Sequence, residues 1–264
     1  MADFTAKDVQ ALRQSTGAGM MDAKRALTEN GGDPEAAAQW LREKGLAKAA
    51  GRTDRDNSQG TVAVAQEGDV AAVVELKCET DFVAKSDQFT SLVQEIATLV
   101  AVKGTDAAGD KADAIDDLKV VLKENIELGQ VVRVEAAAGN VIDSYVHRQD
   151  GRGVNGVIVE LSGGTSEIAH DVAVHIAFAK PTAIRRDEVP EAEVAAEREA
   201  LTAITRAEGK PEAALDKIVE GRLGGWFKDR VLLEQGFVKD EKTSIEKLLG
   251  GAEVVRFAQV VVGG

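Results

Sequence analysis

The sequence predicts an α+β fold, and three observations carry this prediction. Two stretches, residues 61–103 and 140–180, each read as strand, turn, strand and helix. The second strand of each stretch contains the tripeptide Val-Glu-Leu, at 74–76 and at 159–161. Helical patterns without strand signals precede and follow this pair. Strands joined by short turns form antiparallel sheets, so we expect a core of two related halves, each an antiparallel sheet backed by helices.

Residues 1–50 predict a three-helix unit. The first helix ends near the glycines of STGAGMMD, and the second ends at Asn30-Gly31-Gly32. Asp33-Pro34 marks the start of the third helix, because proline is favoured at the first helical position. The positions that carry the helical patterns are Val9, Leu12, Arg13, Met21, Ala23, Ala26, Leu27, Ala37, Trp40 and Leu41. Residues 51–60 are polar and flanked by glycine, which indicates a linker.

Residues 61–139 form the expected first half of the core. Two β-rich runs surround Glu67-Gly68-Asp69, which is a hairpin signal. A helix follows them, and a second helical pattern covers about 110–124. The stripes that we expect to face inward are Phe89, Leu92, Val93, Ile96, Leu99 and Val100 in the first helix, and Ile115, Leu118, Val121 and Leu122 in the second.

Residues 140–186 form the expected second half, with a helix that turns Ile168, Val172, Ile176 and Ala177 inward. Residues 187–228 are rich in Ala and Glu and carry few apolar positions. Glu208-Gly209-Lys210-Pro211 interrupts them, with glycine after one helix and proline opening the next. This pattern predicts an antiparallel helical hairpin whose narrow apolar stripe makes it protrude. Residues 229–264 add a short helix and a β-run that we expect to return to the core.

The charge balance favours a protein partner. The chain carries a net charge of −13 with a pI near 4.8, and its basic residues are interleaved with acids. Such a chain repels phosphate groups, so direct binding of nucleic acid or of an anionic membrane is not expected. The first residues lack the apolar stretch of a signal peptide, and no apolar run approaches the ~20 residues of a membrane span. We therefore expect a cytoplasmic protein.

No constellation of residues predicts covalent chemistry, a metal site or a cofactor. The single cysteine, Cys78, follows an apolar run and is interpreted as a small buried residue, with a reactive thiol as the less favoured reading. His170 and His175 lie five residues apart, which does not place them on one helix face. Zinc-binding, nucleotide-binding and nucleophile motifs are not found, and the glycine pairs fall where elements end.

Two longer stretches are more specific. LRQSTGAGMMDAKRALTENGGD (12–33) and TDFVAKSDQF (80–89) resemble the signatures of the bacterial translation elongation factor Ts family. Further agreement lies in ENI (124–126), SYVH (144–147), VAVHIAFAKP (172–181), GKPEAALDKIVEGRL (209–223) and LEQGFV (233–238). The resemblance covers nearly the whole chain, with the motifs in order.

The resemblance implies a fold and a mechanism. It implies an N-terminal domain similar to ubiquitin-associated domains, a core of two related halves and a protruding hairpin. It implies a guanine-nucleotide exchange factor, without covalent chemistry of its own, that binds the GTPase elongation factor Tu. Such a factor disturbs the magnesium and phosphate sites of the GTPase and releases GDP so that GTP can enter. The partner forms implied are GDP-bound and nucleotide-free, and a homodimer within a heterotetramer is compatible with the family.

The resemblance also implies contact residues. Asp81 and Phe82, with Thr80 and Val83 beside them, would intrude between two helices of the GTPase's nucleotide domain. The N-terminal unit would dock on another helix of that domain. The full set of partner contacts is Arg13, Met20, Met21, Lys24, Thr80, Asp81, Phe82, Val83, His147, Gln235, Phe237 and Val238. Two positions depart from the family pattern, with Lys123 where Gly is frequent and Gly236 where Pro is common. The chain also ends soon after its last β-run, where some relatives carry a further helix.

The residues alone leave alternatives open. Met20 and Met21 can be read as residues of the small helical unit, one facing its core and the other exposed. His147 can be read as a surface residue at a strand end. Phe82 is in phase with the stripe of Phe89 and would be buried if one helix ran through both, but Ser86 is a favourable N-cap that would separate them. For function, the alternative is a non-catalytic helical adaptor or a holding chaperone.

Overall fold

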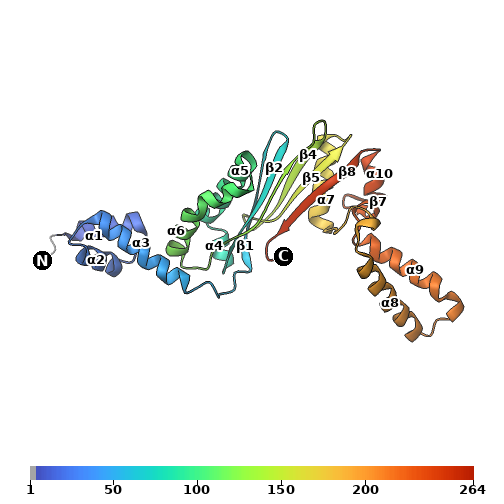
Figure 1. Ribbon diagram of the computed structural model, residues 1–264, viewed down its shortest axis with the longest axis horizontal. Coiled ribbons are helices and arrows are strands. Elements are labelled where there is room, and N and C mark those ends of the chain that lie inside the picture. The colour runs from blue at the N-terminus through green and yellow to red at the C-terminus, as the bar shows by residue number, and fades with distance from the viewer. Residues whose placement is uncertain (1–3) are drawn as a thin grey trace.

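The computed structural model describes residues 4–264. Over this range the molecule is elongated, with three helices at one end, two sheets in the middle and a helical hairpin at the other end (Figure 1). The helices are α1 Ala6–Thr16, α2 Met20–Glu29, α3 Pro34–Ala50, α4 Asp81–Ala84, α5 Asp87–Lys103, α6 Ala112–Leu122, α7 Ser166–Ala179, α8 Glu191–Ala207, α9 Glu212–Lys228 and α10 Ile245–Leu249. Short 3₁₀ helices cover Thr105–Lys111, Arg186–Glu188 and Leu232–Glu234.

The strands form antiparallel sheets. They are β1 Gln59–Glu67, β2 Val70–Cys78, β3 Glu127–Glu135, β4 Val141–Gln149, β5 Arg152–Ser162, β6 Gly236–Phe237, β7 Asp240–Ser244 and β8 Glu253–Val261. One sheet has the order β1-β2-β3, a second has the order β4-β5-β8, and β6 and β7 form a small ribbon. The prediction of an α+β fold with antiparallel sheets is confirmed.

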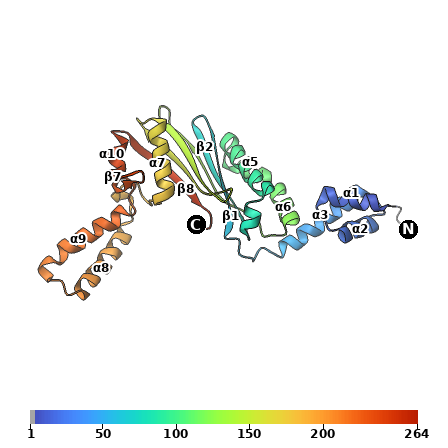
Figure 2. The same ribbon diagram turned by 180° about the vertical axis from the view of Figure 1, so that it is seen from behind.

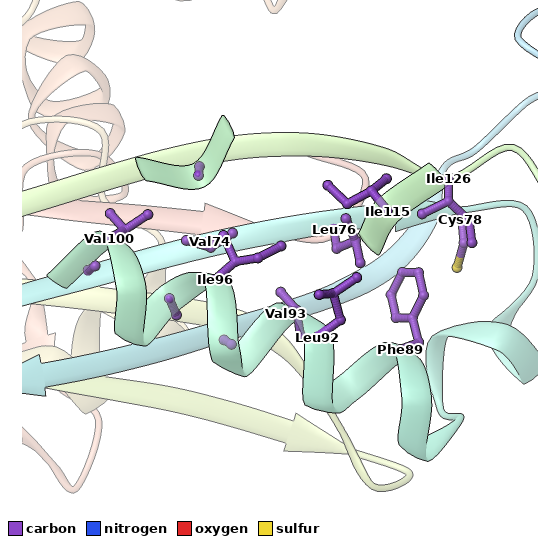
Figure 3. Close-up of a cluster of buried hydrophobic side chains, with 14 of the residues drawn as sticks. Val74, Leu76, Cys78, Phe89, Leu92, Val93, Ile96, Val100, Ile115 and Ile126 are labelled. Carbon is purple, nitrogen blue, oxygen red and sulfur yellow. The ribbon is translucent and has the colours of Figure 1, made fainter. Parts of the chain in front are cut away.

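The core is built in four layers. Helices α5 and α6 lie on the outside of the first sheet and α7 lies on the outside of the second, as the two opposite views show (Figures 1 and 2). Five of the six residues expected on the inner stripe of the first long helix, Phe89, Leu92, Val93, Ile96 and Val100, lie in the buried cluster with Leu76 and Cys78 of β2 (Figure 3). Leu99 is half-buried and lies outside this cluster. The sheets pack directly on each other through Val62, Val73 and Ile158, which share one buried cluster.

Close contact between the two sheets requires a glycine. A Cβ atom at Gly156 would lie 2.6 Å from methyl groups of Val62 and of Val73. Real Cβ atoms do not approach other atoms so closely, so any larger residue would separate the sheets. The glycine at position 156 of β5 is therefore required by the packing of the two sheets.

The three N-terminal helices begin and end as their sequence predicts. Thr5 caps α1 through a reciprocal pair of hydrogen bonds with Asp8, and the Asp33 side chain caps α3, which starts at Pro34. Leu12 and Leu27 lie in a small buried cluster of their own. Helix α3 of this unit contacts α6 of the core.

The hairpin is made of α8 and α9 and projects from the far end of the core (Figure 1). The base of α9 packs through Leu223 and Phe227 against Ala183 and Val231. Pro211 is the N-cap residue of α9 and not its first helical residue, because its ψ of 134° is extended.

Two further expectations are corrected. The sequence patterns assign no element to residues 127–135, where β3 completes the first sheet, because its half-buried positions lack a clear alternation. Val121 was expected to face inward with Ile115, but it is 41% exposed because it points toward Gly17 of the N-terminal unit instead of the core. The helix around it is also shorter than expected, since α6 ends at Leu122 and Lys123 adopts a left-handed conformation.

Candidate protein-interaction site

The TDFV motif forms a one-turn helix that holds one aromatic ring in solvent. Thr80 is the N-cap of α4, and its hydroxyl accepts a hydrogen bond from the Val83 N–H at 3.3 Å. Ala84 and half-buried Val83 pack against the first core cluster, whereas the Phe82 side chain is 82% exposed. The reading in which Phe82 continues the buried stripe of Phe89 is therefore wrong.

Ser86 separates this turn from the long helix. It is the N-cap residue of α5 and has extended backbone angles. Its hydroxyl does not cap α5 but donates to the Val83 carbonyl at 2.8 Å, which closes the preceding turn. Because the chain changes direction at Ser86, Phe82 and Phe89 do not share a helix face.

The ENI motif, which lies between α6 and β3, forms hydrogen bonds with the start of the TDFV motif. The Glu124 carboxylate accepts hydrogen bonds from the backbone N–H groups of Glu79 and Thr80, at 3.0 and 3.1 Å. The Asn125 N–H donates to the Glu79 carboxylate at 2.7 Å. The Asn125 amide also donates to the carbonyls of Thr53 and Arg55, so it ties the linker to the same point. The exposed ring thus rises from a firmly held base.

Asp81 is fixed within α4 by a charge pair. Lys85 Nζ lies 2.7 Å from the Asp81 carboxylate, one helical turn away. The hydrogen bond from the Lys85 side chain lowers the pKa of Asp81 from its ordinary value, with the charge of Lys85 adding to the effect. Lys85 also lies 3.8 Å from the carboxylate of Asp150 in the turn between β4 and β5.

The structure brings that turn, which follows His147 by three residues, to the same end of the core as Phe82. Arg152, at the start of β5, donates to the carbonyl of Gly60 at 2.7 Å and to the side chain of Gln59 at 2.9 Å. His147 is exposed near the end of β4, just before a register shift of the strand pair. Its Nδ1 lies 3.4 Å from the hydroxyl of Tyr145, which is on the same face of the strand.

A second group of expected contacts lies on the N-terminal unit. Met20 and Met21 form the first turn of α2 and are 48% and 74% exposed, so the alternative reading in which one of them is buried is wrong. Lys24 is exposed one turn further along α2, and Arg13 is exposed on α1, which packs against α2. Within residues 4–264 neither cation takes part in an ion pair. Two flexible apolar side chains and two free charges make a surface suited to an irregular protein partner.

The third group of expected contacts, Gln235, Phe237 and Val238, does not expose its side chains to solvent as the first two groups do. Gln235 and Phe237 are buried, and Val238 is half-buried against the cluster of the second half. The Phe237 ring lies 6.3 Å from the ring of His175 on α7. The side chains of Gln235 and Phe237 are therefore packed into the core, Gly236 is exposed, and the segment lies apart from both α4 and the N-terminal unit.

Sequence reasoning missed the residues that hold the exposed ones in place. Glu124 and Asn125 were recognised only as part of a motif, and Lys85 and Arg152 received no role. The available signal was the order Glu-Asn directly after a helix, since short polar side chains there often bind nearby backbone groups. Their actual partners lie more than forty residues away in sequence, which only the fold reveals.

Other candidate features of residues 4–264 are the cysteine, possible metal ligands and long apolar helices. Cys78 is fully buried and burial raises the pKa of its thiol to about 12, which confirms its interpretation as a packed, unreactive side chain. In the part of the chain that the structure describes, no group of three His, Cys, Asp or Glu side chains is placed to bind a metal ion. Over the same residues, no helix combines the length and the hydropathy needed to cross a membrane.

Comparisons with known proteins agree with the motifs. A family model described as Elongation factor TS matches residues 79–264. The chain is 46% identical to Elongation factor Ts of Kineococcus radiotolerans, with both chains covered completely. It is 45% identical to Elongation factor Ts of Thermobifida fusca, over all of this chain and 99% of the relative. Elongation factor Ts of Clavibacter sepedonicus is 44% identical, again over both full chains.

Proposed function

The chain belongs to the elongation factor Ts family, and from this premise we propose that it is a guanine-nucleotide exchange factor for the translational GTPase elongation factor Tu. It binds the GTPase, disturbs its magnesium and phosphate sites and promotes release of GDP. The work needs no covalent chemistry by this chain. The single observation that carries the proposal is the exposed ring of Phe82 on a short, rigidly anchored helix.

Phe82 acts as an apolar probe. The ring inserts between two helices of the nucleotide domain, with Asp81 beside it. Burying one Phe side chain yields ~2–3 kcal/mol. If that energy is available only when the nucleotide site is distorted, it weakens GDP binding by ~30–100-fold, since each ~1.4 kcal/mol is a factor of ten. Larger effects need further contacts.

The anchoring explains how this energy can distort the partner. A flexible loop would adapt to the GTPase and leave its nucleotide site unchanged. Here Glu124 fixes the start of α4 and Lys85 fixes Asp81, so the ring is already in position. A pre-organised element gives up little conformational freedom on binding, and the available free energy goes into the partner.

The N-terminal unit supplies a second contact. Met20 and Met21 dock on a different helix of the nucleotide domain, with Arg13 and Lys24 at the rim. This unit is the module that resembles a ubiquitin-associated domain. Two contacts on one partner raise affinity more than either alone, provided that their separation is fixed.

The remaining expected residues take more limited roles. His147 is exposed at the same end as Phe82 and contributes to that contact. Gln235 and Phe237 are buried, so they shape their segment and leave the partner contact to Val238 and the exposed Gly236. The two binding events are coupled reciprocally. If this protein weakens the binding of GDP to the GTPase, GDP weakens the binding of this protein to the GTPase by the same factor. The partner forms that it favours, GDP-bound and nucleotide-free, and a dimer within a heterotetramer, stay predictions.

Release of labelled GDP tests the proposal. The GTPase is loaded with fluorescent GDP, mixed with excess unlabelled nucleotide, and given this protein at a small fraction of its own concentration. We expect the release rate to rise in proportion to the added protein, with many GDP molecules released per molecule added. The alternative is an adaptor or holding chaperone, in which the N-terminal unit grips a helix and the hairpin spaces it. Such a protein would leave the rate unchanged, and that result would contradict the proposed function.

A further inference from the structure

A chain of buried hydrogen bonds connects α7, the segment 235–238 and the end of α9. The Val238 N–H donates to Nδ1 of His175 at 3.2 Å. Nε2 of His175 lies 3.0 Å from Oε1 of Gln235, and Nε2 of Gln235 donates to the Asp229 carbonyl at 3.1 Å. His175 and Gln235 are both buried. The two side chains thus connect the backbone of the segment to the backbone at the base of the hairpin, and we call them the His175 relay.

The two ends of the His175 relay fix its direction. A backbone N–H can only donate, so Nδ1 of His175 accepts and carries no proton. A backbone carbonyl can only accept, so the amide NH₂ of Gln235 faces Asp229 and the amide oxygen faces His175. That oxygen needs a donor, which is the N–H at Nε2. The neutral imidazole with its proton on Nε2 therefore satisfies every group, whereas an imidazolium would direct an N–H at the Val238 N–H.

The surroundings favour the neutral ring. Burial lowers the pKa of His175, and the hydrogen bond to Gln235 opposes this only in part. The charged and titratable groups on the elements around it are Glu167, His170 and Asp171 on α7, Asp143, His147 and Arg148 on β4, Arg152 and Glu160 on β5, Glu246 and Lys247 on α10, Lys239 and Asp240 after the segment, and Asp229, Arg230 and Glu234 beside the end of α9. Lys239 is paired with Asp171, and Glu234 is paired with Arg186. None of these charges lies in an ion pair with His175 among the residues that the structure describes.

We propose that His175 is a positioning residue, whose neutral form with the proton on Nε2 holds residues 235–238 and the base of the hairpin in the arrangement that meets the GTPase. The part concerning the GTPase rests on the proposed function. Elsewhere the segment is held by the burial of Gln235 and Phe237, by the pairing of β6 with β7, and by the hydrogen bond from the Ile245 N–H to the Gln235 carbonyl, whereas the Val238 N–H has its acceptor in His175. The acceptor at Nδ1 is therefore the decisive group, because it holds the backbone of the segment directly.

Two substitutions separate the two ring nitrogens. In His175→Asn the side-chain oxygen takes the place of Nδ1, and in His175→Gln the polar end takes the place of Nε2. We expect the Val238 amide to exchange with solvent up to about tenfold faster in His175→Gln than in His175→Asn, which is the range of one hydrogen bond. A role in packing alone predicts equal effects, or the smaller effect for Gln, whose volume is closer to that of His. Either of those results would overturn the proposal.

The same variants are then tested for binding to the GTPase. We expect His175→Gln to bind about tenfold more weakly than the unsubstituted chain, and His175→Asn to lie within about threefold of it. His170→Gln is the matched control, because His170 is exposed on the same helix and pairs with Asp143. If the unsubstituted chain does not bind at all, the proposed function fails, and exchange of the Val238 amide in the free protein still decides the role of His175.

The unsubstituted chain gives a reading that does not depend on the folding of any variant. Nitrogen-15 NMR of the imidazole distinguishes a protonated from an unprotonated ring nitrogen. We expect an unprotonated Nδ1 and a protonated Nε2 for His175 at neutral pH, and loss of Val238 amide protection as His175 becomes protonated in acid. The opposite tautomer, or an amide whose protection does not follow that titration, would refute the proposal.

Discussion

At the scale of single residues, the exposure of Phe82 is set by its neighbours. Thr80 caps the one-turn helix α4, and Ala84 is the buried residue of that helix. A new helix starts after Ser86, so Phe82 does not continue the buried stripe of α5. Glu124 then binds the backbone where the turn begins. The ring therefore contributes little burial to the free protein and is open to solvent, as the proposed contact with the GTPase requires.

Phe82→Ala should separate function from stability. We expect a strong loss of nucleotide exchange, by ~30–100-fold if one buried ring is lost from the complex. The melting temperature should stay nearly unchanged, because the side chain is 82% exposed. Exchange rates and thermal unfolding check this. Phe178→Ala is the control, since it removes an equally exposed ring, 75% in solvent, from α7. A large fall in melting temperature would show that Phe82 supports the core.

Phe89→Ala should behave in the opposite way. Phe89 is fully buried beside Cys78 in the cluster between α5 and the first sheet (Figure 3). Truncating a buried Phe costs ~3–5 kcal/mol through lost contacts and the cavity left behind. Chemical denaturation should show this loss of unfolding free energy. A change below ~1 kcal/mol would mean that the cluster is not closely packed.

Cys78 should resist alkylation in the folded protein. Its thiol is fully buried, has a pKa raised to about 12 and donates to the Thr80 carbonyl at 3.2 Å. The reactive thiolate is therefore scarce at neutral pH and inaccessible. Mass spectrometry after iodoacetamide treatment should show modification only when denaturant unfolds the chain. Rapid labelling under native conditions would contradict this.

At the scale of elements, the repeated Val-Glu-Leu reflects a shared structural device. Glu75 and Glu160 are both buried, and each lies where the third strand of its sheet shifts register. Glu160 accepts hydrogen bonds from Ala137, Asn140 and Arg256. Glu75 accepts from the backbone N–H groups of Gln130 and Gly263, both at 3.4 Å. In each half the buried carboxylate thus accepts hydrogen bonds at the point where the strand pairing is irregular.

Arg256→Ala should therefore destabilise the second sheet in a pH-dependent way. Burial raises the pKa of Glu160, but the hydrogen bonds from Asn140, Ala137 and Arg256 outweigh it and the pKa is lowered. A carboxylate with a lowered pKa stabilises the fold above its unfolded pKa, and this contribution is lost as the pH falls through the folded value. The substitution should cost about 1–3 kcal/mol at neutral pH, because it leaves a buried carboxylate short of one donor.

Denaturation of both proteins at neutral pH and in acid checks this prediction. The difference in unfolding free energy should shrink in acid, where Glu160 is protonated in either protein. Arg148→Ala is the control, because Arg148 lies on β4 in the same sheet, is exposed, and is in no ion pair within the described range. A difference that stays constant with pH would show that Arg256 acts through packing alone.

Most helices and strands of this chain can be predicted from sequence patterns. The three N-terminal helices, the hairpin α8–α9 and the two strand pairs were predicted because caps, turns and periodic stripes lie within each segment. Strand β3 was missed because most of its side chains are half-buried on an edge strand, which weakens the alternation. Val121 was placed in the core because a helical pattern cannot tell an inner face from a face that meets another unit.

At the scale of the whole molecule, the orientation of the N-terminal unit depends on a narrow contact. Arg42 forms ion pairs with Asp117 at 2.9 Å and Asp113 at 3.3 Å. Beside them α3 approaches α6 so closely that a Cβ atom at Gly45 would lie 2.4 Å from a methyl group of Val120. This contact joins the N-terminal unit to the core at one end of the elongated molecule (Figure 2).

Gly45→Val should detach the N-terminal unit from α6. The new side chain cannot fit, because Val120 is β-branched and has little freedom to rotate within a helix. We expect a larger radius of gyration by small-angle X-ray scattering, an unchanged melting temperature of the core and weaker binding to the GTPase. Gly221→Ala is the control, since this helical glycine has open space around it. An unchanged scattering profile would show that the contact does not set the orientation.

The sequence by itself determined most of the local elements, though not strand β3, and also the α+β class, the burial of Cys78 and the family. These follow from caps, turns, periodicity and motif residues that are neighbours in the chain. Only the tertiary structure decided that Phe82, Met20 and Met21 are exposed while Gln235 and Phe237 are buried. It also decided that Glu124 holds the TDFV turn and that His175 joins two distant segments. The physical reason is that exposure and hydrogen-bond partners depend on contacts between residues far apart in sequence, which no local pattern contains.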